Sequence, residues 1–98
     1  LDCSDRNIED PDPVLRDEET AAYTKAYLDL TLDFANVKQV TLWSMADRVS
    51  YMNRPGYPDY KRRDDDFALR GHPYDDNWRP KKMRTAIAEA LLSTPQRG

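Results

Sequence analysis

Apolar residues in the first half of the chain recur with the period of a helix. Their spacings are four, three and four residues, which places the side chains on one helical face. They are Tyr23, Tyr27, Leu30 and Phe34. The acidic residues 17–19 favour a first turn at this point, because negative charge is stabilised near the positive end of the helix dipole. We therefore expect an amphipathic helix over residues 17–36, with Asn36 as its stop.

A strand and a long loop are predicted after this helix. Residues 38–43 end in four strand-favouring residues, Val40 to Trp43. The run is apolar on both faces, as in a buried parallel strand. Residues 44–79 show no such period and contain several prolines and glycines. Loops of this length within a compact domain are usually functional or disordered.

The last predicted element is a helix over residues 80–93. Pro80 suits its first position, where the missing N–H has no partner to lose. Its expected buried stripe consists of Met83, Ile87, Ala90 and Leu91. Residues 1–16 are expected to be irregular, because prolines at positions 11 and 13 restrict the backbone. Helix, strand, loop and helix in this order are typical of an α/β fold. One strand cannot form a sheet, so we expect more protein around this chain.

Charge and composition exclude several classes of function. The 98 residues allow one small domain, and 15 basic against 18 acidic residues give a net charge of −3. The basic run 61–63 is followed at once by the acidic run 64–66, which argues against a nucleic-acid partner. No apolar run approaches the roughly 20 residues of a membrane span, so no membrane partner is predicted. The chain starts at Leu1 and not at methionine, which favours a processed chain or a fragment.

Few residues carry obvious catalytic or metal-binding chemistry. The single histidine, His72, lies between Gly71 and Pro73 and is interpreted as a loop residue, because no nucleophile motif accompanies it. Cys3 is the single cysteine, which excludes an internal disulfide and favours a small packed residue. The acidic runs lack the spacing of a calcium loop and are interpreted as solvated turns. We expect no metal and no cofactor.

Trp43 and Tyr51 are the aromatic residues with the strongest case for a binding role. Both could be core residues, as large aromatics often are. However, Trp43 falls at the expected end of a strand, where ligand sites of α/β folds lie. Tyr51 opens the long loop and could reach the same place. Aromatic faces stack on the C–H faces of sugars, so a carbohydrate site is a reasonable hypothesis.

Residues 39–51, residues 70–81 and the opening Leu1-Asp2 resemble three motifs of one family, glycoside hydrolase family 10, the endo-1,4-β-xylanases. Residues 39–51 read QVTLWSMADRVSY, which resembles the family's V-T-x-W-G-x-x-D-x-x-S-W. Residues 70–81 read RGHPYDDNWRPK, which resembles R-P-L-L-F-D-x-x-Y-x-P-K. The opening Leu-Asp matches the end of T-E-L-D. The chain departs from the family pattern where Ser44 replaces a glycine and Tyr51 replaces the second tryptophan.

The resemblance implies the last units of a (β/α)8 TIM barrel: the end of strand seven, helix seven, strand eight and helix eight. Residues 44–79 would form the substrate loop. Trp43 would line the glycone subsite, with Tyr51 closing over it. Asp2 would support the nucleophile and a histidine, both of which would lie upstream. Loop-shaping residues would be Asp47, Arg48 and Ser50.

The function implied by the resemblance is that of a retaining endo-1,4-β-xylanase, which cleaves internal β-1,4-xylosidic bonds. Its partners would be xylan or xylo-oligosaccharides and the upstream remainder of the barrel. Both catalytic glutamates would lie upstream, so the 98 residues alone should be inactive. The family resemblance implies a secreted or periplasmic enzyme. Two alternatives stay open: a noncatalytic carbohydrate-binding remnant and a fragment that complements a separate part of the barrel.

Overall fold

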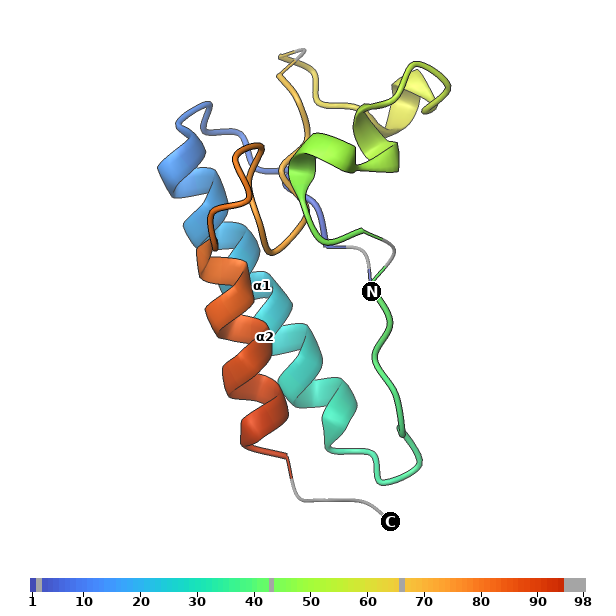
Figure 1. The fold of residues 1–98 in the computed structure, drawn as a ribbon, viewed down its shortest axis with the longest axis vertical. Coiled ribbons are helices and arrows are strands. Elements are labelled where there is room, and N and C mark those ends of the chain that lie inside the picture. Colours follow the sequence, from blue (N-terminus) through green and yellow to red (C-terminus); the bar gives the residue numbers. More distant parts are fainter. Residues whose placement is uncertain (2, 43, 66, 95–98) are drawn as a thin grey trace.

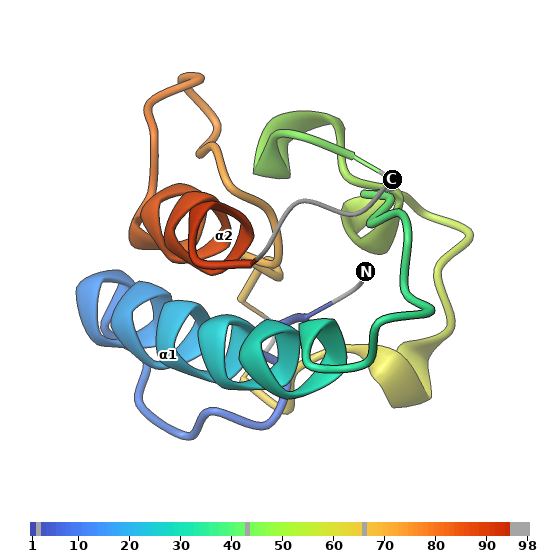
Figure 2. The same ribbon diagram turned by 90° about the horizontal axis from the view of Figure 1, so that it is seen from below.

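Two α-helices and three short 3-10 helices make up the regular structure of the described residues. A computed structural model describes residues 1, 3–42, 44–65 and 67–94. The α-helices are α1 (Pro13–Leu32) and α2 (Lys82–Leu92). The 3-10 helices are η1 (Asp47–Val49), η2 (Tyr51–Asn53) and η3 (Asp59–Lys61). α1 and α2 lie side by side and run in the same direction, and the loops gather beyond their N-terminal ends (Figures 1 and 2).

Helix α1 begins four residues before the predicted start and ends four residues before the predicted stop. Asp12 caps it, since its side chain accepts a 2.9 Å hydrogen bond from the N–H of Val14. Pro13 follows at the first helical position, which suits its fixed backbone. The acidic residues 17–19 therefore lie in the second turn and not in the first. The cap residue decided the start, and the acidic run did not.

The buried face of α1 is not the predicted stripe. The four large residues of that stripe are 48% to 67% exposed. The buried residues include Thr20, Thr24 and Leu28. Each threonine hydroxyl donates a 2.7 Å hydrogen bond to the carbonyl four residues earlier, so burial leaves it satisfied. A face of threonine and alanine is less bulky than one of tyrosine and phenylalanine, and it lies buried where α1 packs on α2.

Among the described residues, two small hydrophobic clusters form the core of the helix pair. The first contains Cys3, Ala21, Met83 and Ala86. The second contains Leu28, Leu32 and Ala90. Leu1 and Ile87 are partly buried and pack against both clusters, so they join them. The core therefore lies between α1, α2 and the first residues of the chain.

The expected α/β fold class is wrong for the described part of the chain, in which no β-strand forms. Residues 38–42 are extended but pair with no neighbouring strand. They run back along the helices toward the loops (Figure 1). The amino group of Leu1 donates a 2.5 Å hydrogen bond to the Thr41 carbonyl, but this single bond does not make a ladder. Strand-favouring residues alone do not form a sheet, so the structure shows neither β/α units nor part of a TIM barrel.

Helix α2 starts two residues after the predicted position. Pro80 lies before it and forms an isolated antiparallel bridge with Tyr74. Met83 and Ala90 of the expected stripe are buried, whereas Leu91 is exposed. Neither helix combines the length and apolar character needed to cross a bilayer, as far as the described residues show.

Candidate functional site

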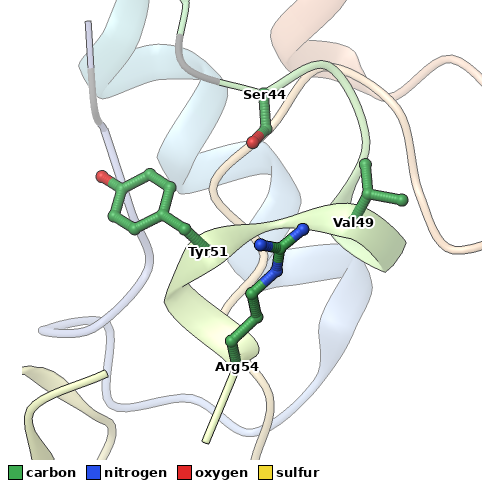
Figure 3. Close-up of a pocket in the computed structure, with 4 residues that line it drawn as sticks. All are labelled: Ser44, Val49, Tyr51 and Arg54. Carbon is green, nitrogen blue, oxygen red and sulfur yellow. The ribbon is translucent and has the colours of Figure 1, made fainter. Parts of the chain in front are cut away.

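The candidate site is a pocket of about 470 Å³ beside the two 3-10 helices η1 and η2. It is lined by Ser44, Val49, Tyr51 and Arg54 (Figure 3). Ser44 comes directly after Trp43, and the other three residues lie on or next to the 3-10 helices. In Figure 3 the guanidinium of Arg54 extends toward the Ser44 side of the pocket. The lining thus combines an aromatic ring, a hydroxyl, an aliphatic side chain and a cation.

Ser50 sets the position of Tyr51 through the local backbone. Its hydroxyl accepts a 3.1 Å hydrogen bond from the N–H of Met52 and so caps η2. The N–H of Arg54 then donates to the Tyr51 carbonyl at 3.3 Å, which closes the short helix. The Tyr51 ring meets the ring of Tyr57 edge to face, with centroids 5.8 Å apart. Tyr51 is therefore fixed at both its backbone and its ring.

Residues 69–74 pack along the pocket residues and fasten both 3-10 helices. At one end the Asn53 side chain donates to the Leu69 carbonyl at 2.9 Å and accepts from the Leu69 N–H at 2.8 Å. At the other end the Tyr74 carbonyl accepts a 2.9 Å hydrogen bond from the N–H of Asp47. Between them lies His72, which is 1% exposed. These contacts connect positions about twenty residues apart in the sequence.

His72 connects the two 3-10 helices to each other. Its Nε2 lies 2.7 Å from the Ser50 hydroxyl, and the two share a hydrogen bond. Its backbone N–H donates to a carboxylate oxygen of Asp47 at 3.1 Å. One residue thus contacts the cap of η2 and the first residue of η1. The prediction placed His72 in a loop, but this loop residue is buried and structurally important.

Gly71 allows this close packing. A Cβ at this position would lie 3.1 Å from the Cys3 carbonyl oxygen and 3.2 Å from the Cα of Ser4. Both are backbone atoms, which cannot move aside as the end of a flexible side chain can. Glycine therefore lets residues 69–74 approach the start of the chain while His72 reaches the pocket residues.

A buried ion pair holds Asp47, the first residue of η1. Lys81 donates from its Nζ to Asp47 at 2.9 Å and to the Arg70 carbonyl at 3.0 Å. Burial raises the pKa of the Asp47 carboxyl above its usual value, although the Lys81 ammonium and the His72 N–H act in the opposite direction. Arg70 in turn forms two hydrogen bonds with Asp17 at 2.8 and 2.9 Å, which link this region to α1.

The predicted site residues fall into three groups. Trp43 and Asp2 lie outside the described residues. Tyr51 lines the pocket, and Asp47 and Ser50 lie buried in the hydrogen-bond network beside it. Arg48 is exposed to solvent.

Sequence reasoning missed five residues of the pocket or its support: Ser44, Val49, Asn53, Arg54 and His72. The recognised motif ends at Tyr51, so Arg54 fell outside it. His72 could not be assigned from its neighbours, because its partners are 22 and 25 residues away in the sequence. Among these residues only Asn53 carried a sequence signal, because an Asn side chain in a loop often hydrogen-bonds to the backbone. This signal is weak.

The pocket lining supports binding more directly than bond cleavage. None of the described lining residues is an aspartate or a glutamate. Retaining glycoside hydrolysis requires two carboxyl groups about 5–5.5 Å apart on either side of the scissile bond. The described part of the chain also has no group of three His, Cys, Asp or Glu side chains placed to hold a metal ion. The arrangement can stack on a ring and donate hydrogen bonds to it.

Comparison of the chain with family models, with curated proteins and with solved structures gave no match.

Proposed function

We propose that the chain binds β-1,4-linked xylose units in the pocket and supplies these contacts to a retaining endo-1,4-β-xylanase. One observation carries the proposal: the Tyr51 ring, the Ser44 hydroxyl and the Arg54 guanidinium line one pocket. An aromatic face attracts the C–H face of a sugar, while hydroxyl and guanidinium groups donate hydrogen bonds to sugar hydroxyls. The motif of residues 39–51 supports xylan as the polymer.

The proposal assigns binding, and not cleavage, to these 98 residues. The described lining residues include no carboxylate, so a nucleophile and an acid/base would have to come from outside them. In the family that the motifs resemble, both glutamates precede the Leu-Asp pair. We therefore expect the 98-residue chain alone to release no reducing sugar from xylan. Hydrolysis by this purified chain would contradict that division of roles.

Titration calorimetry with xylohexaose tests the binding proposal. Tyr51→Ala removes the stacking ring and is expected to weaken binding at least tenfold, which corresponds to about 1.4 kcal/mol. Tyr27→Ala is the matched control, because Tyr27 is an exposed tyrosine on α1 and is not among the residues that line the pocket. Equal affinities of both variants would rule out the pocket as the xylose site.

A noncatalytic carbohydrate-binding role is the second candidate, and the absence of a carboxylate among the described lining residues favours it. The natural full-length protein distinguishes the two candidates. A xylanase should cut xylan internally and release products that retain the β-anomeric configuration, which NMR can follow in time. Binding of xylan without any cleavage would leave only the noncatalytic role.

A further inference from the structure

Arg54 differs from the next three arginines along the chain. Arg62, Arg63 and Arg70 each form an ion pair with an aspartate. Arg54 lines the pocket and is exposed, and it forms no ion pair with any described residue. Its backbone is anchored, since its carbonyl accepts a 2.7 Å hydrogen bond from Arg62. The backbone of Arg54 is therefore fixed beside the pocket, and the five donors of its guanidinium are available to a ligand.

Two more cations lie near the aromatic pair that Tyr51 forms with Tyr57. The Tyr57 ring has Lys61 and Arg62 near its face, with the Lys61 ammonium 6.0 Å and the Arg62 guanidinium carbon 5.8 Å from the ring centroid. Arg54 lines the pocket beside them. Three cations thus lie near the Tyr51–Tyr57 pair.

The sequence around the pocket is basic although the whole chain is acidic. Residues 44–63 contain five Lys or Arg residues and two Asp residues, whereas the full chain has 15 basic and 18 acidic residues. One of the two aspartates, Asp47, is buried against Lys81, just as one of the five cations, Arg63, is buried against Asp65; neither faces a ligand in solvent. The other aspartate, Asp59, lies 3.6 Å from Arg62. The pocket side therefore attracts negative charge.

We infer that the pocket prefers an acidic xylo-oligosaccharide, one that carries a uronic acid carboxylate, and that Arg54 binds this carboxylate. The inference rests on the proposed xylose binding and adds the chemical class of the substrate. The planar guanidinium matches a carboxylate in a two-bond pairing that a sugar hydroxyl cannot form. Tyr51 binds the sugar ring regardless of charge, so the two residues have separable roles.

The test compares two ligands of equal backbone length, neutral xylotetraose and xylotetraose bearing one uronic acid. We expect the acidic ligand to bind about tenfold more tightly at low salt and to lose part of this advantage at higher ionic strength. Arg54→Gln should remove the preference, so that the variant binds the acidic and the neutral ligand with equal affinity. Arg48→Gln is the matched control, because Arg48 is exposed but is not among the described residues of the pocket lining, and it should keep the preference.

The outcomes separate this inference from the proposed function. Equal affinity for both ligands, or a preference that survives Arg54→Gln, would overturn the inference and leave xylose binding intact. Failure of both ligands to bind would overturn xylose binding itself, and with it the inference. Tighter binding of a single-stranded oligonucleotide than of the acidic ligand would also overturn the inference, since phosphate would then be the preferred anion. Unchanged thermal unfolding of Arg54→Gln shows that the variant is folded.

Discussion

The helix pair and the loop region are held together by different forces. Here the helix pair is α1 with α2, and the loop region is the described part of residues 44–74. Between the helices the contacts are mostly short apolar side chains such as Ala21, Ala86 and Ala90. In the loop region buried polar side chains dominate, among them Asp47, Ser50, Arg63 and His72. In its described part, the loop region is thus ordered by buried polar contacts and not by pairing of strands.

The two kinds of contact differ in how far they reach along the chain. Hydrogen bonds of a helix connect neighbouring turns, so a local pattern is enough to form it. The loop region depends on pairs such as Arg63 with the Asp5 carbonyl and Asn53 with Leu69, which are 58 and 16 residues apart. Such contacts are directional, and each unpaired buried group destabilises the folded state. Loss of one polar partner in the loop region should therefore lower the free energy of unfolding more than loss of one methyl group in the helix pair.

The largest effect is expected at Asp5, the fully buried carboxylate that joins the loop region to α1. Its carboxylate accepts a hydrogen bond from Arg16 Nε at 2.5 Å and another from the Arg70 N–H at 2.8 Å. Asp5→Ala leaves the buried Arg16 without its partner and should lower the free energy of unfolding by about 3–5 kcal/mol. Urea denaturation measures this. Asp29→Ala removes an exposed pair with Lys25 and should cost less than about 1 kcal/mol; equal costs would refute the contrast.

Leu28 provides the matching test in the helix pair. It is 1% exposed and packs with Leu32 and Ala90, so Leu28→Ala creates a cavity and should cost about 2–4 kcal/mol of unfolding free energy. Leu30, two residues along the same helix, is 67% exposed. Leu30→Ala should change stability by less than about 0.5 kcal/mol. The reverse order would mean that the originally predicted stripe, which contains Leu30, is the buried one.

His72→Ala should have a smaller effect on stability and a specific effect on the pocket. It removes the partner of the Ser50 hydroxyl but keeps the backbone bond to Asp47, so we expect a cost of about 1–3 kcal/mol. Affinity for xylohexaose should fall as well, because Ser50 caps the helix that carries Tyr51.

Calorimetry on a double-mutant cycle distinguishes positioning from general destabilisation. If His72 acts through Tyr51, then His72→Ala adds no further loss of affinity in a Tyr51→Ala background. Fully additive losses would show that His72 affects binding by another route.

The smallest effect is a pH dependence from Asp65. A hydrogen bond from Arg63 lowers the pKa of Asp65 from 3.8 to about 2. Because the folded value lies below the ordinary one, the pair stabilises the protein above pH 3.8 and loses this contribution as the pH falls toward about 2. Asp65→Asn should flatten the acid side of the stability profile, measured by urea denaturation over the pH range in which the chain stays folded. Asp64→Asn, its exposed neighbour, should leave the slope unchanged.

The sequence predicted that both helices exist but not where they begin or which side is buried. Each start was placed by a general signal, acidic residues for α1 and Pro80 for α2. The structure instead uses the Asp12 cap for α1 and begins α2 at Lys82. The prediction of the buried face of α1 was wrong because large apolar residues outweigh threonine in a hydrophobic pattern. Buried threonines whose hydroxyls bond within their own helix do not register in such a pattern.

The candidate site was predicted in part. The motif drew attention to Tyr51, Asp47 and Ser50, which line the pocket or lie buried in the hydrogen-bond network beside it. It gave no reason to consider Arg54 or His72. Both acquire their surroundings only from distant segments, since the partners of His72 and the neighbours of Arg54 are assembled by the folding of residues 44–74.

The sequence by itself determined two helices, a long intervening loop and an aromatic, partly basic segment after Trp43, because these follow from local period, turn residues and charge. Only the tertiary structure decided that residues 38–42 stay unpaired, that threonines and not tyrosines face the core, and that His72 is buried against Asp47 and Ser50. The physical reason is the same in each case. A strand, a buried face and a buried polar group each need a partner from elsewhere in the chain, and local sequence does not contain that partner.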